Sequence, residues 1–217
     1  MPTEPRNQHG YIRAITGCMF SGKTEAGSQY LKRALVSKKK SPVVFVPSQA
    51  KRIITINVSN EELETDGKMV SRNGFIIEAI EFPANNPNFI LNYVLDHPEI
   101  TTIFIDEIHF CSSNLVDICK ILANELKLEV TVMGLDQNFS EEGFGPMPAL
   151  MVEAEFVEKS LAVCTDCGND YACKSWLDSR SRNQVTDNDK LAGDRQYVAV
   201  CRACFQERIK KYGPPKK

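Results

Sequence analysis

The sequence predicts an α/β protein, in which a parallel sheet is flanked by helices and a small second domain follows toward the C-terminus. Short apolar runs alternate with helical segments as far as about residue 140, which is typical of parallel strands joined by right-handed crossovers. A glycine-rich loop connects the first predicted strand to the first helix. Paired cysteines then replace the alternation, so we expect a main domain over residues 11–150 and a second over residues 151–212.

The first elements are predicted by short apolar patterns. Residues 12–16, "IRAIT", form a predicted strand. Residues 24–37 form a predicted helix, because apolar or small side chains recur on one face. Residues 42–47, "PVVFVP", are an apolar run bounded by prolines, as expected for a strand buried on both faces of a parallel sheet.

The remaining elements continue the same alternation. A strand is predicted near residues 75–82, and "NFILNYVLDHP" is a predicted helix that stops at Pro98. Residues 101–107, "TTIFIDE", form another buried strand. Residues 113–127 form an amphipathic helix with Ser112 or Ser113 as its N-cap. Residues 129–136 form the last predicted strand of the core.

Size and charge restrict the class of protein. The chain has 217 residues, 42% of them hydrophobic, and a net charge of −2, which suits one ordinary domain with a small appended one. This charge does not favour binding to a DNA duplex or a membrane surface. No run reaches the roughly 18 apolar residues of a membrane span, and the polar first ten residues do not form a signal peptide. We therefore expect a cytosolic protein with reduced thiols.

The loop Gly17–Thr24, "GCMFSGKT", fits the P-loop pattern G-x-x-x-x-G-K-[ST]. Glycines at positions 17 and 22 let backbone N–H groups approach a nucleotide's phosphates. Lys23 supplies a cation to the β- and γ-phosphates, the Thr24 hydroxyl reaches Mg²⁺, and the following helix points its N-terminus at the anion. The alternative is an ordinary Gly-Lys turn, which the position between a strand and a helix disfavours.

Two acidic residues stand at the end of the predicted strand of residues 101–107. Asp106 is the expected Walker-B carboxylate that holds Mg²⁺. Glu107 points in a different direction, so it can serve as a base beside an acceptor hydroxyl, as in a kinase. The alternative for Glu107 is a solvent-exposed carboxylate at a strand end. His109 is either a pocket residue or a loop histidine with its hydrogen bonds satisfied.

Two C-x-x-C pairs, Cys164 with Cys167 and Cys201 with Cys204, predict a closed, structural zinc site with four thiolate ligands. The alternative is four unrelated thiols. Among the other cysteines, Cys111 and Cys119 are predicted to be small buried hydrophobes. Cys173 is a possible spare ligand.

These motifs together resemble the type II, cytosolic-type thymidine kinases. The resemblance rests on "GCMFSGKT", "DEIHF" (106–110), "LDQNFSEEGFG" (135–145), "AEFVEKSLAVCTDCG" (154–168) and "YVAVCRACF" (197–205), which occur in this order. It implies that ATP and a deoxynucleoside are the substrates, with thymidine as the expected acceptor and dTMP as the product. It also implies Mg²⁺, a structural Zn²⁺, a lasso loop on the zinc domain and a homotetramer.

The resemblance also assigns residues. It makes Glu107 the base that deprotonates the 5′-hydroxyl and adds Ser21 to the phosphate-binding loop. It implies a pocket for the nucleoside base lined by Met19, Phe110, Leu135, Phe139, Phe144 and Tyr197. Phe20 is expected to lie in the core instead.

Several positions depart from the family pattern. His109 stands where the family has Gln, Arg72 where it has His, and Ala50 where it has an acidic residue, although Arg52 is kept. "KSWL" (174–177) replaces T-x-R-L, and the polar insert "LDSRSRNQVTDNDKLAGDRQ" follows. The phosphate-binding residues are therefore retained, whereas the residues that read the base are altered.

Two other functions remain open. A P-loop NTPase whose zinc module binds nucleic acid is suggested by the "SRSRNQ" segment, although the chain lacks the basic charge that such binding favours. A catalytically weakened relative kept for binding is suggested only by the departures at Arg72 and "KSWL".

Overall fold

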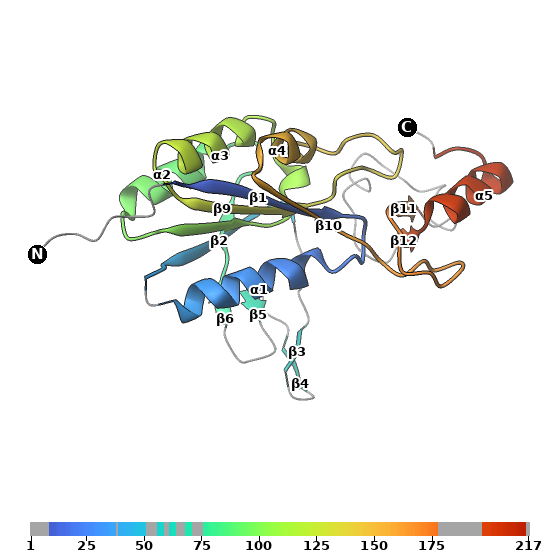
Figure 1. The fold of residues 1–217 in the computed structure, drawn as a ribbon, viewed down its shortest axis with the longest axis horizontal. Helices are drawn as coiled ribbons and strands as arrows, with labels where there is room; N and C mark the ends of the chain where they lie inside the picture. Colours follow the sequence, from blue (N-terminus) through green and yellow to red (C-terminus); the bar gives the residue numbers. More distant parts are fainter. Residues whose placement is uncertain are drawn as a thin grey trace, which may run out of the picture.

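The computed structural model describes residues 9–37, 39–50, 56–58, 61–63, 68–70, 76–177 and 197–215. Its main feature is a six-stranded sheet in the order β10-β1-β9-β8-β2-β7 (Figure 1). All of its neighbouring strands pair in parallel. The strands are β1 (Tyr11–Gly17), β2 (Pro42–Pro47), β7 (Ile80–Phe82), β8 (Thr102–Ile105), β9 (Glu129–Gly134) and β10 (Phe156–Ser160).

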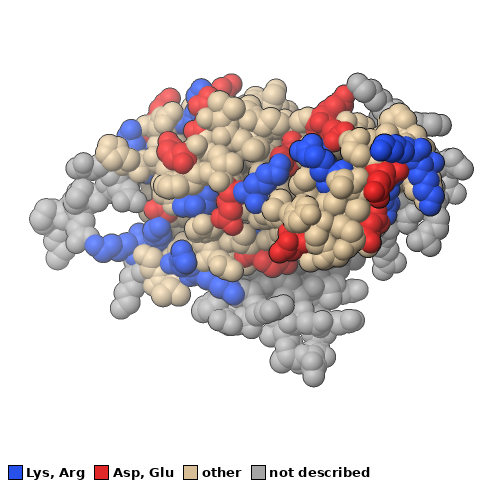
Figure 2. Space-filling view, turned by 45° about the vertical axis from the view of Figure 1, so that its right-hand side comes forward, with Lys and Arg blue, Asp and Glu red and all other residues tan. Residues whose placement is uncertain are grey.

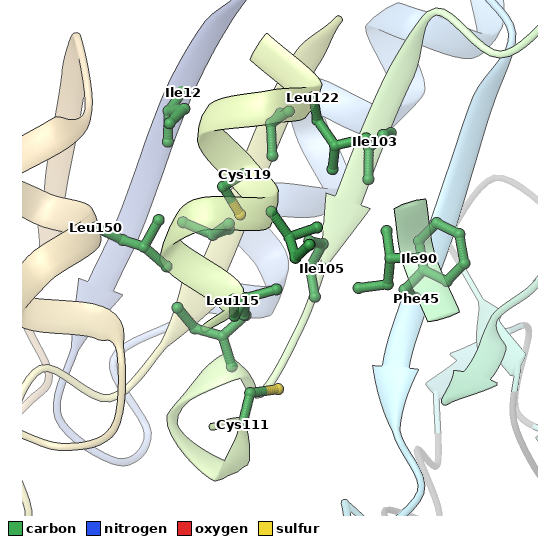
Figure 3. Close-up of a cluster of buried hydrophobic side chains, with 14 of the residues drawn as sticks. Ile12, Phe45, Ile90, Ile103, Ile105, Cys111, Leu115, Cys119, Leu122 and Leu150 are labelled. Carbon is green, nitrogen blue, oxygen red and sulfur yellow. The ribbon is translucent and has the colours of Figure 1, made fainter. Parts of the chain in front are cut away.

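Helices cover both faces of this sheet. Helix α1 (Lys23–Val36) lies on one face, and α2 (Asn88–Asp96), α3 (Leu115–Asn124) and α4 (Met147–Glu153) lie on the other (Figure 1). Successive strand residues point to opposite faces. In β8, Phe104 belongs to the apolar cluster on the α1 face, whereas Ile103 and Ile105 belong to the cluster that includes Leu115 of α3 (Figure 3). These two apolar layers explain why the strands are apolar throughout.

Four short strands form two small hairpins outside the main sheet. β3 (Ile56–Val58) pairs with β4 (Glu61–Leu63), and β5 (Lys68–Val70) pairs with β6 (Ile76–Glu78), both antiparallel. The predicted strand near residues 75–82 is therefore divided. Its first part, β6, pairs with β5, whereas its second part, β7, pairs with β2 in the main sheet.

The C-terminal part has its own small core. Strand β11 (Lys174–Leu177) pairs antiparallel with β12 (Tyr197–Val200), and helix α5 (Arg202–Tyr212) follows. Trp176 and Phe205 are buried there and meet edge to face, with ring centroids 5.3 Å apart. Aromatic pairs of this geometry stabilise a small apolar cluster beyond the burial of their area. The predicted fold class is confirmed in this arrangement of parallel sheet, flanking helices and small C-terminal unit with four clustered cysteines.

Element ends differ from the predictions in two places. The N-cap of α3 is Asn114, not Ser112 or Ser113. The Ser112 hydroxyl instead donates to the carbonyl of Ala84, which precedes α2.

Strand β10 lies beyond the predicted domain boundary at residue 150, yet it pairs with β1 in the main sheet; the division at 150 stays a prediction. Within the described residues, none of the helices combines the length and apolar character that crossing a bilayer requires.

Candidate active site

The chemically interesting loops meet at one edge of the sheet. Strand β9 lies between β1 and β8, and all three run in the same direction. The carboxyl ends of parallel strands lie at the same sheet edge, where ligands bind in open α/β folds. The P-loop follows β1, the Asp106–Glu107 pair follows β8, and the segment beginning at Leu135 follows β9.

The P-loop has the backbone that its glycines predict. Gly22 has φ of 77° and precedes the first turn of α1. At Gly17, with φ of 148°, an added Cβ would lie 2.3 Å from the Ser160 carbonyl oxygen and 2.6 Å from the Ser21 hydroxyl. Only glycine fits this contact between the loop and β10. The Lys23 ammonium donates to the Cys18 carbonyl across the loop, over 2.7 Å.

Two P-loop residues differ in their surroundings. Phe20 is 55% exposed and has φ of 62°, so the prediction that it lies in the core is wrong. A left-handed backbone at Phe20 goes together with a side chain that lies largely in solvent. The backbone N–H of Met19 donates to the Ser175 hydroxyl of β11 over 3.0 Å. The C-terminal unit therefore contacts the P-loop directly.

Asp106 joins the P-loop to the end of β8. Its Oδ2 accepts a hydrogen bond from the Thr24 hydroxyl at 3.4 Å, and its Oδ1 accepts the N–H of Glu107 at 2.8 Å. The Asp106 side chain is buried. A buried carboxylate beside the P-loop hydroxyl is the oxygen-donor pair that suits Mg²⁺.

Glu107 is a buried residue, so the alternative of a solvent-exposed carboxylate is wrong. Its backbone is left-handed, with φ of 53° and ψ of 36°. Such a conformation costs a non-glycine residue on the order of 1–3 kcal/mol and is concentrated at functional sites. The two neighbouring carboxylates contact different partners. Asp106 accepts from Thr24, whereas Oε2 of Glu107 lies 3.3 Å from Nε2 of His109.

His109 lies in the short 3₁₀ helix η1 (Ile108–Phe110) and is in contact with several proposed pocket residues. Its ring lies 4.1 Å from the ring of Phe110 and 4.8 Å from that of Phe144, measured between centroids. Its Nδ1 accepts the backbone N–H of Leu135 at 3.2 Å. His109 thus contacts residues that are expected to line the pocket, and its Nδ1 has a hydrogen-bond partner; its role as a pocket residue stays a prediction.

The remaining predicted pocket residues form a second contact. The rings of Phe139 and Tyr197 lie 6.3 Å apart between centroids. Phe139 belongs to the segment after β9, and Tyr197 opens β12 in the C-terminal unit. Aromatic residues from both units therefore meet at this edge of the sheet.

A buried lysine fastens the segment after β9 to the C-terminal unit. The Lys174 ammonium donates to the side-chain Oε1 of Gln137 and pairs with the Glu141 carboxylate, each at 2.8 Å. The Gln137 amide donates to the Cys173 carbonyl at 2.9 Å. Lys174 stands where the family pattern has Thr, so this departure from the pattern creates a charged anchor for the loop that carries Phe139 and Phe144.

The four predicted zinc ligands come together. The sulfur atoms of Cys164, Cys167, Cys201 and Cys204 all lie within 4.8 Å of one another, and this is the group of metal-ligand type found among the described residues. Zn–S bonds of about 2.3 Å in a tetrahedron place the sulfurs about 3.8 Å apart. The 3.9 Å between the sulfurs of Cys167 and Cys201 fits this spacing. Cys173 is not part of the group.

The pKa shifts of the clustered thiols run in both directions, since burial raises the pKa of Cys204 whereas that of Cys201 is lowered. The backbone N–H of Cys204 lowers the pKa of the Cys201 thiol to about 6, and the Asn169 amide contributes in the same direction. Burial raises the pKa of Cys18 to about 11 and that of Cys111 to about 12. Cys111 and Cys119 are buried in the main apolar cluster, as predicted. Thiolates are the metal-binding form of cysteine, and the lowered pKa of Cys201 favours the thiolate at that position.

Some sequence predictions fall on positions outside the described residues. These are Arg52, which the family pattern keeps, the departure at Arg72, and residues 178–196 of the polar insert, which include "SRSRNQ".

The sequence did not single out several residues that make these contacts. Ser175, Gln137 and Glu141 act through contacts between distant segments, which no local motif encodes. Another such pair is Asp136 with Lys159 of β10, 2.5 Å apart. The register that places Thr16 beside both Lys159 and Gly134 brings the ends of β9 and β10 close together. Lys174 and Ser175 had a sequence signal only as part of the "KSWL" departure from the family pattern.

Comparison with known proteins identifies the family. The model of the thymidine kinase family matches residues 10–205. A thymidine kinase from Bacteroides fragilis (strain YCH46) is 34% identical over 206 residues, which is 94% of this chain and 91% of that protein. A thymidine kinase from Haloquadratum walsbyi is 32% identical over an alignment of 216 residues that covers 90% of this chain and 94% of that protein.

Among solved structures, the Legionella pneumophila ATPase DotB aligns with a TM-score of 0.43 and 12% identity, covering 94% of this chain and 62% of that one. The family assignment rests on the sequence matches, which extend from before β1 to the second pair of clustered cysteines. The chain belongs to the thymidine kinase family.

Proposed function

We propose that this protein is an ATP-dependent thymidine kinase, which transfers the γ-phosphate of ATP to the 5′-hydroxyl of thymidine and yields dTMP. The observation that carries the proposal is the buried pair Asp106 and Glu107, whose carboxylates contact different partners at the sheet edge beside the P-loop. A kinase needs one carboxylate that binds the metal and another that acts as a base on the acceptor hydroxyl.

The phosphate-binding roles follow from the loop geometry. We assign the backbone around Gly17 and Gly22 to the phosphates, with Lys23 as the cation for the β- and γ-phosphates. Thr24 and Asp106 are suited to hold the Mg²⁺ of the nucleotide, which neutralises charge on the transferring phosphoryl group when bound. The Ser21 hydroxyl is buried and has no hydrogen-bond partner among the described residues, so a phosphate oxygen is a fitting partner.

The acceptor side rests on Glu107. We assign it as the general base that takes the proton of the 5′-hydroxyl, since a positioned carboxylate serves that role in phosphoryl transfer. We assign the pocket for the thymine base to Met19, Phe110, Leu135, Phe139, Phe144 and Tyr197. The ring contacts of Phe110 with Phe144 and of Phe139 with Tyr197 support these assignments.

The alternative, a P-loop NTPase that binds nucleic acid through its zinc module, is not favoured. On the face drawn in Figure 2, lysine and arginine side chains are interspersed with aspartate and glutamate. A single-stranded or duplex nucleic acid is bound mainly through a continuous basic surface, and the chain as a whole carries a net charge of −2.

The discriminating experiment incubates the protein with ATP, Mg²⁺ and a panel of deoxynucleosides, with and without single-stranded DNA. The proposal expects thymidine monophosphate, with slower or no phosphorylation of deoxycytidine and the purine deoxynucleosides. ATP hydrolysis that requires DNA and forms no nucleoside monophosphate would support the alternative. If neither nucleoside monophosphate nor DNA-dependent ATP hydrolysis is observed, the protein would be a weakened relative kept for binding.

We further propose that Cys164, Cys167, Cys201 and Cys204 hold one structural Zn²⁺ that stabilises the unit of residues 151–212. Structural zinc contributes folding free energy directly. We expect about one zinc per chain by metal analysis without chelator, and Cys201→Ser should lower the melting temperature by several degrees. Cys173→Ser is the matched control, because Cys173 lies outside the cluster; its zinc content and melting temperature should stay at the wild-type values. Purified protein without zinc would contradict the assignment.

The proposed assembly is a cytosolic homotetramer. Strand β10 ends the main sheet and exposes large apolar side chains, with Phe156 47% and Val157 46% exposed. An apolar edge strand that is left uncovered is prone to aggregation, so a second copy of the chain is a fitting cover. We expect Val157→Lys to give a smaller species by size-exclusion chromatography with light scattering. Val152→Lys, at an exposed position of α4, should leave the assembly unchanged; a monomeric wild-type protein would contradict the proposal.

A further inference from the structure

His109 links the proposed base to the segment after β9. The imidazole is buried, with 2% of its side chain exposed. Its Nε2 lies 3.3 Å from Oε2 of Glu107, and its Nδ1 lies 3.2 Å from the backbone nitrogen of Leu135. Both ring nitrogens therefore have partners, one on the loop after β8 and one at the end of β9.

The partners determine the tautomer. A backbone N–H is only a donor, so Nδ1 must present its lone pair to Leu135. A neutral imidazole with its lone pair on Nδ1 carries its hydrogen on Nε2. That hydrogen is therefore on the nitrogen that lies 3.3 Å from the Glu107 carboxylate, which is an acceptor when ionised. The arrangement satisfies both nitrogens without a positive charge on the ring.

The ring itself is held firmly in place. Its centroid lies 4.1 Å from that of Phe110 and 4.8 Å from that of Phe144. Two glycines lie against the same residue: an added Cβ at Gly134 would lie 3.1 Å from His109 Nδ1, and one at Gly145 would lie 2.4 Å from the His109 carbonyl oxygen. Because the ring cannot shift without disturbing these contacts, its Nε2–H has a fixed direction.

We infer that His109 is a positioning residue for phosphoryl transfer, which holds the Glu107 carboxylate in the orientation that receives the proton of the acceptor hydroxyl. This inference rests on the proposed role of Glu107 as the base. Glu107 stands on a left-handed turn, and its flexible side chain needs a second contact to fix its rotamer. The contact between Nε2 and Oε2, 3.3 Å apart, supplies that restraint and defines the direction of the other carboxylate oxygen.

His109 does not relay the proton. To accept a proton, Nδ1 would have to give up the N–H of Leu135, and a buried backbone donor without a partner is costly. The proton of the hydroxyl therefore remains on Glu107 until it leaves the site, and His109 acts through Glu107 instead of touching the reacting atoms.

The test compares His109→Asn with His109→Gln. The Asn side chain is shorter than His, and its amide oxygen can occupy the position of the imidazole Nδ1 and accept the Leu135 N–H. It does not extend to Glu107. The Gln amide extends to the place of Nε2, and its NH₂ group can donate to Glu107. We expect His109→Asn to lower kcat by about 10- to 100-fold, as misplacement of a catalytic group does, with KM for thymidine within a few-fold. His109→Gln should restore most of kcat.

The Glu107→Gln background shows whether His109 acts through Glu107. If it does, adding His109→Asn to Glu107→Gln should cost no further loss beyond about twofold, because the two substitutions remove the same function. His9→Asn, at an exposed position far along the sequence from the site, is the control and should match the wild type. Melting curves of all variants check that they fold.

The outcomes distinguish this inference from the proposed function. Wild-type turnover by Glu107→Gln would show that Glu107 is not the base, and the proposed role of His109 would then fail as well. A slow Glu107→Gln beside a fully active His109→Asn would overturn only the inference. Equal losses in the Asn and Gln variants would also overturn it, since the donor to Glu107 would then not matter. If His109→Asn fails to fold, His109→Phe, which fills the ring space without a donor, takes its place against His109→Gln, with the same expected and contradicting results.

Discussion

Lys23→Ala is expected to reduce thymidine phosphorylation by about 10²–10³-fold, the usual effect of removing one preorganised electrostatic contact to developing charge. The Lys23 ammonium lies on the P-loop and donates to the Cys18 carbonyl. It belongs to none of the three buried apolar clusters. The substitution should therefore remove charge from the phosphate site and leave the fold intact. Steady-state kinetics, with circular dichroism melting as the check on folding, measure both effects.

Lys32→Ala provides the matched control for this prediction. Lys32 lies on the same helix, α1, further from the loop, so its loss removes the same charge without removing a phosphate contact. Its turnover should stay near that of the wild type. Near-normal turnover by Lys23→Ala would remove the support for phosphate binding at this loop. A collapse of the melting temperature would instead show that the lysine stabilises the loop structurally.

Most of the main sheet could be predicted from local patterns. The apolar runs at residues 42–47 and 101–105 are strands because each is buried on both faces, and that burial is visible in the sequence as an unbroken apolar run. The segment near residues 75–82 shows the limit of this reasoning. Its apolar character predicts a strand, but its pairing partners change within the segment, and the choice of partner depends on the rest of the fold.

Short elements were missed for a related reason. Helix α4 has seven residues and β10 has five, which is too short for a clear period. Strand β10 also exposes apolar side chains at the sheet edge, so it lacks the alternation of a half-buried strand. The sequence therefore placed the end of the regular pattern before the last strand of the main sheet.

The candidate site could be predicted as far as its residues lie within motifs. The P-loop, the acidic pair after β8 and the cysteine pairs each have a fixed spacing that reflects their chemistry. The contacts between units have no such spacing. Ser175 binds the backbone of Met19, and Lys174 binds Gln137 and Glu141, across more than 30 positions of sequence in each case. Such contacts depend on how β11 packs against the loops, which only the folded chain defines.

The two acidic residues at the end of β8 should respond differently to loss of charge. Asp106 accepts hydrogen bonds from the Thr24 hydroxyl and from the Glu107 backbone. Asp106→Asn should therefore weaken binding of the magnesium nucleotide as well as turnover, and isothermal calorimetry with Mg²⁺ and ATP measures the first effect. Glu107 contacts His109 instead, so its charge is expected to matter mainly when the acceptor hydroxyl loses its proton.

Glu107→Gln is accordingly expected to lower kcat by about 10²–10⁴-fold, the range of general-base catalysis, while the affinities for ATP and thymidine stay within a few-fold. The Gln side chain keeps the size of Glu and can still accept the Nε2–H of His109, but it cannot take a proton. Glu99→Gln, in the exposed turn between α2 and β8, is the control for loss of one negative charge. Steady-state kinetics give kcat, and calorimetry gives the affinities. If Glu107→Gln turns over thymidine at the wild-type rate, the base must lie elsewhere, and Asp136 at the end of β9 is the next candidate.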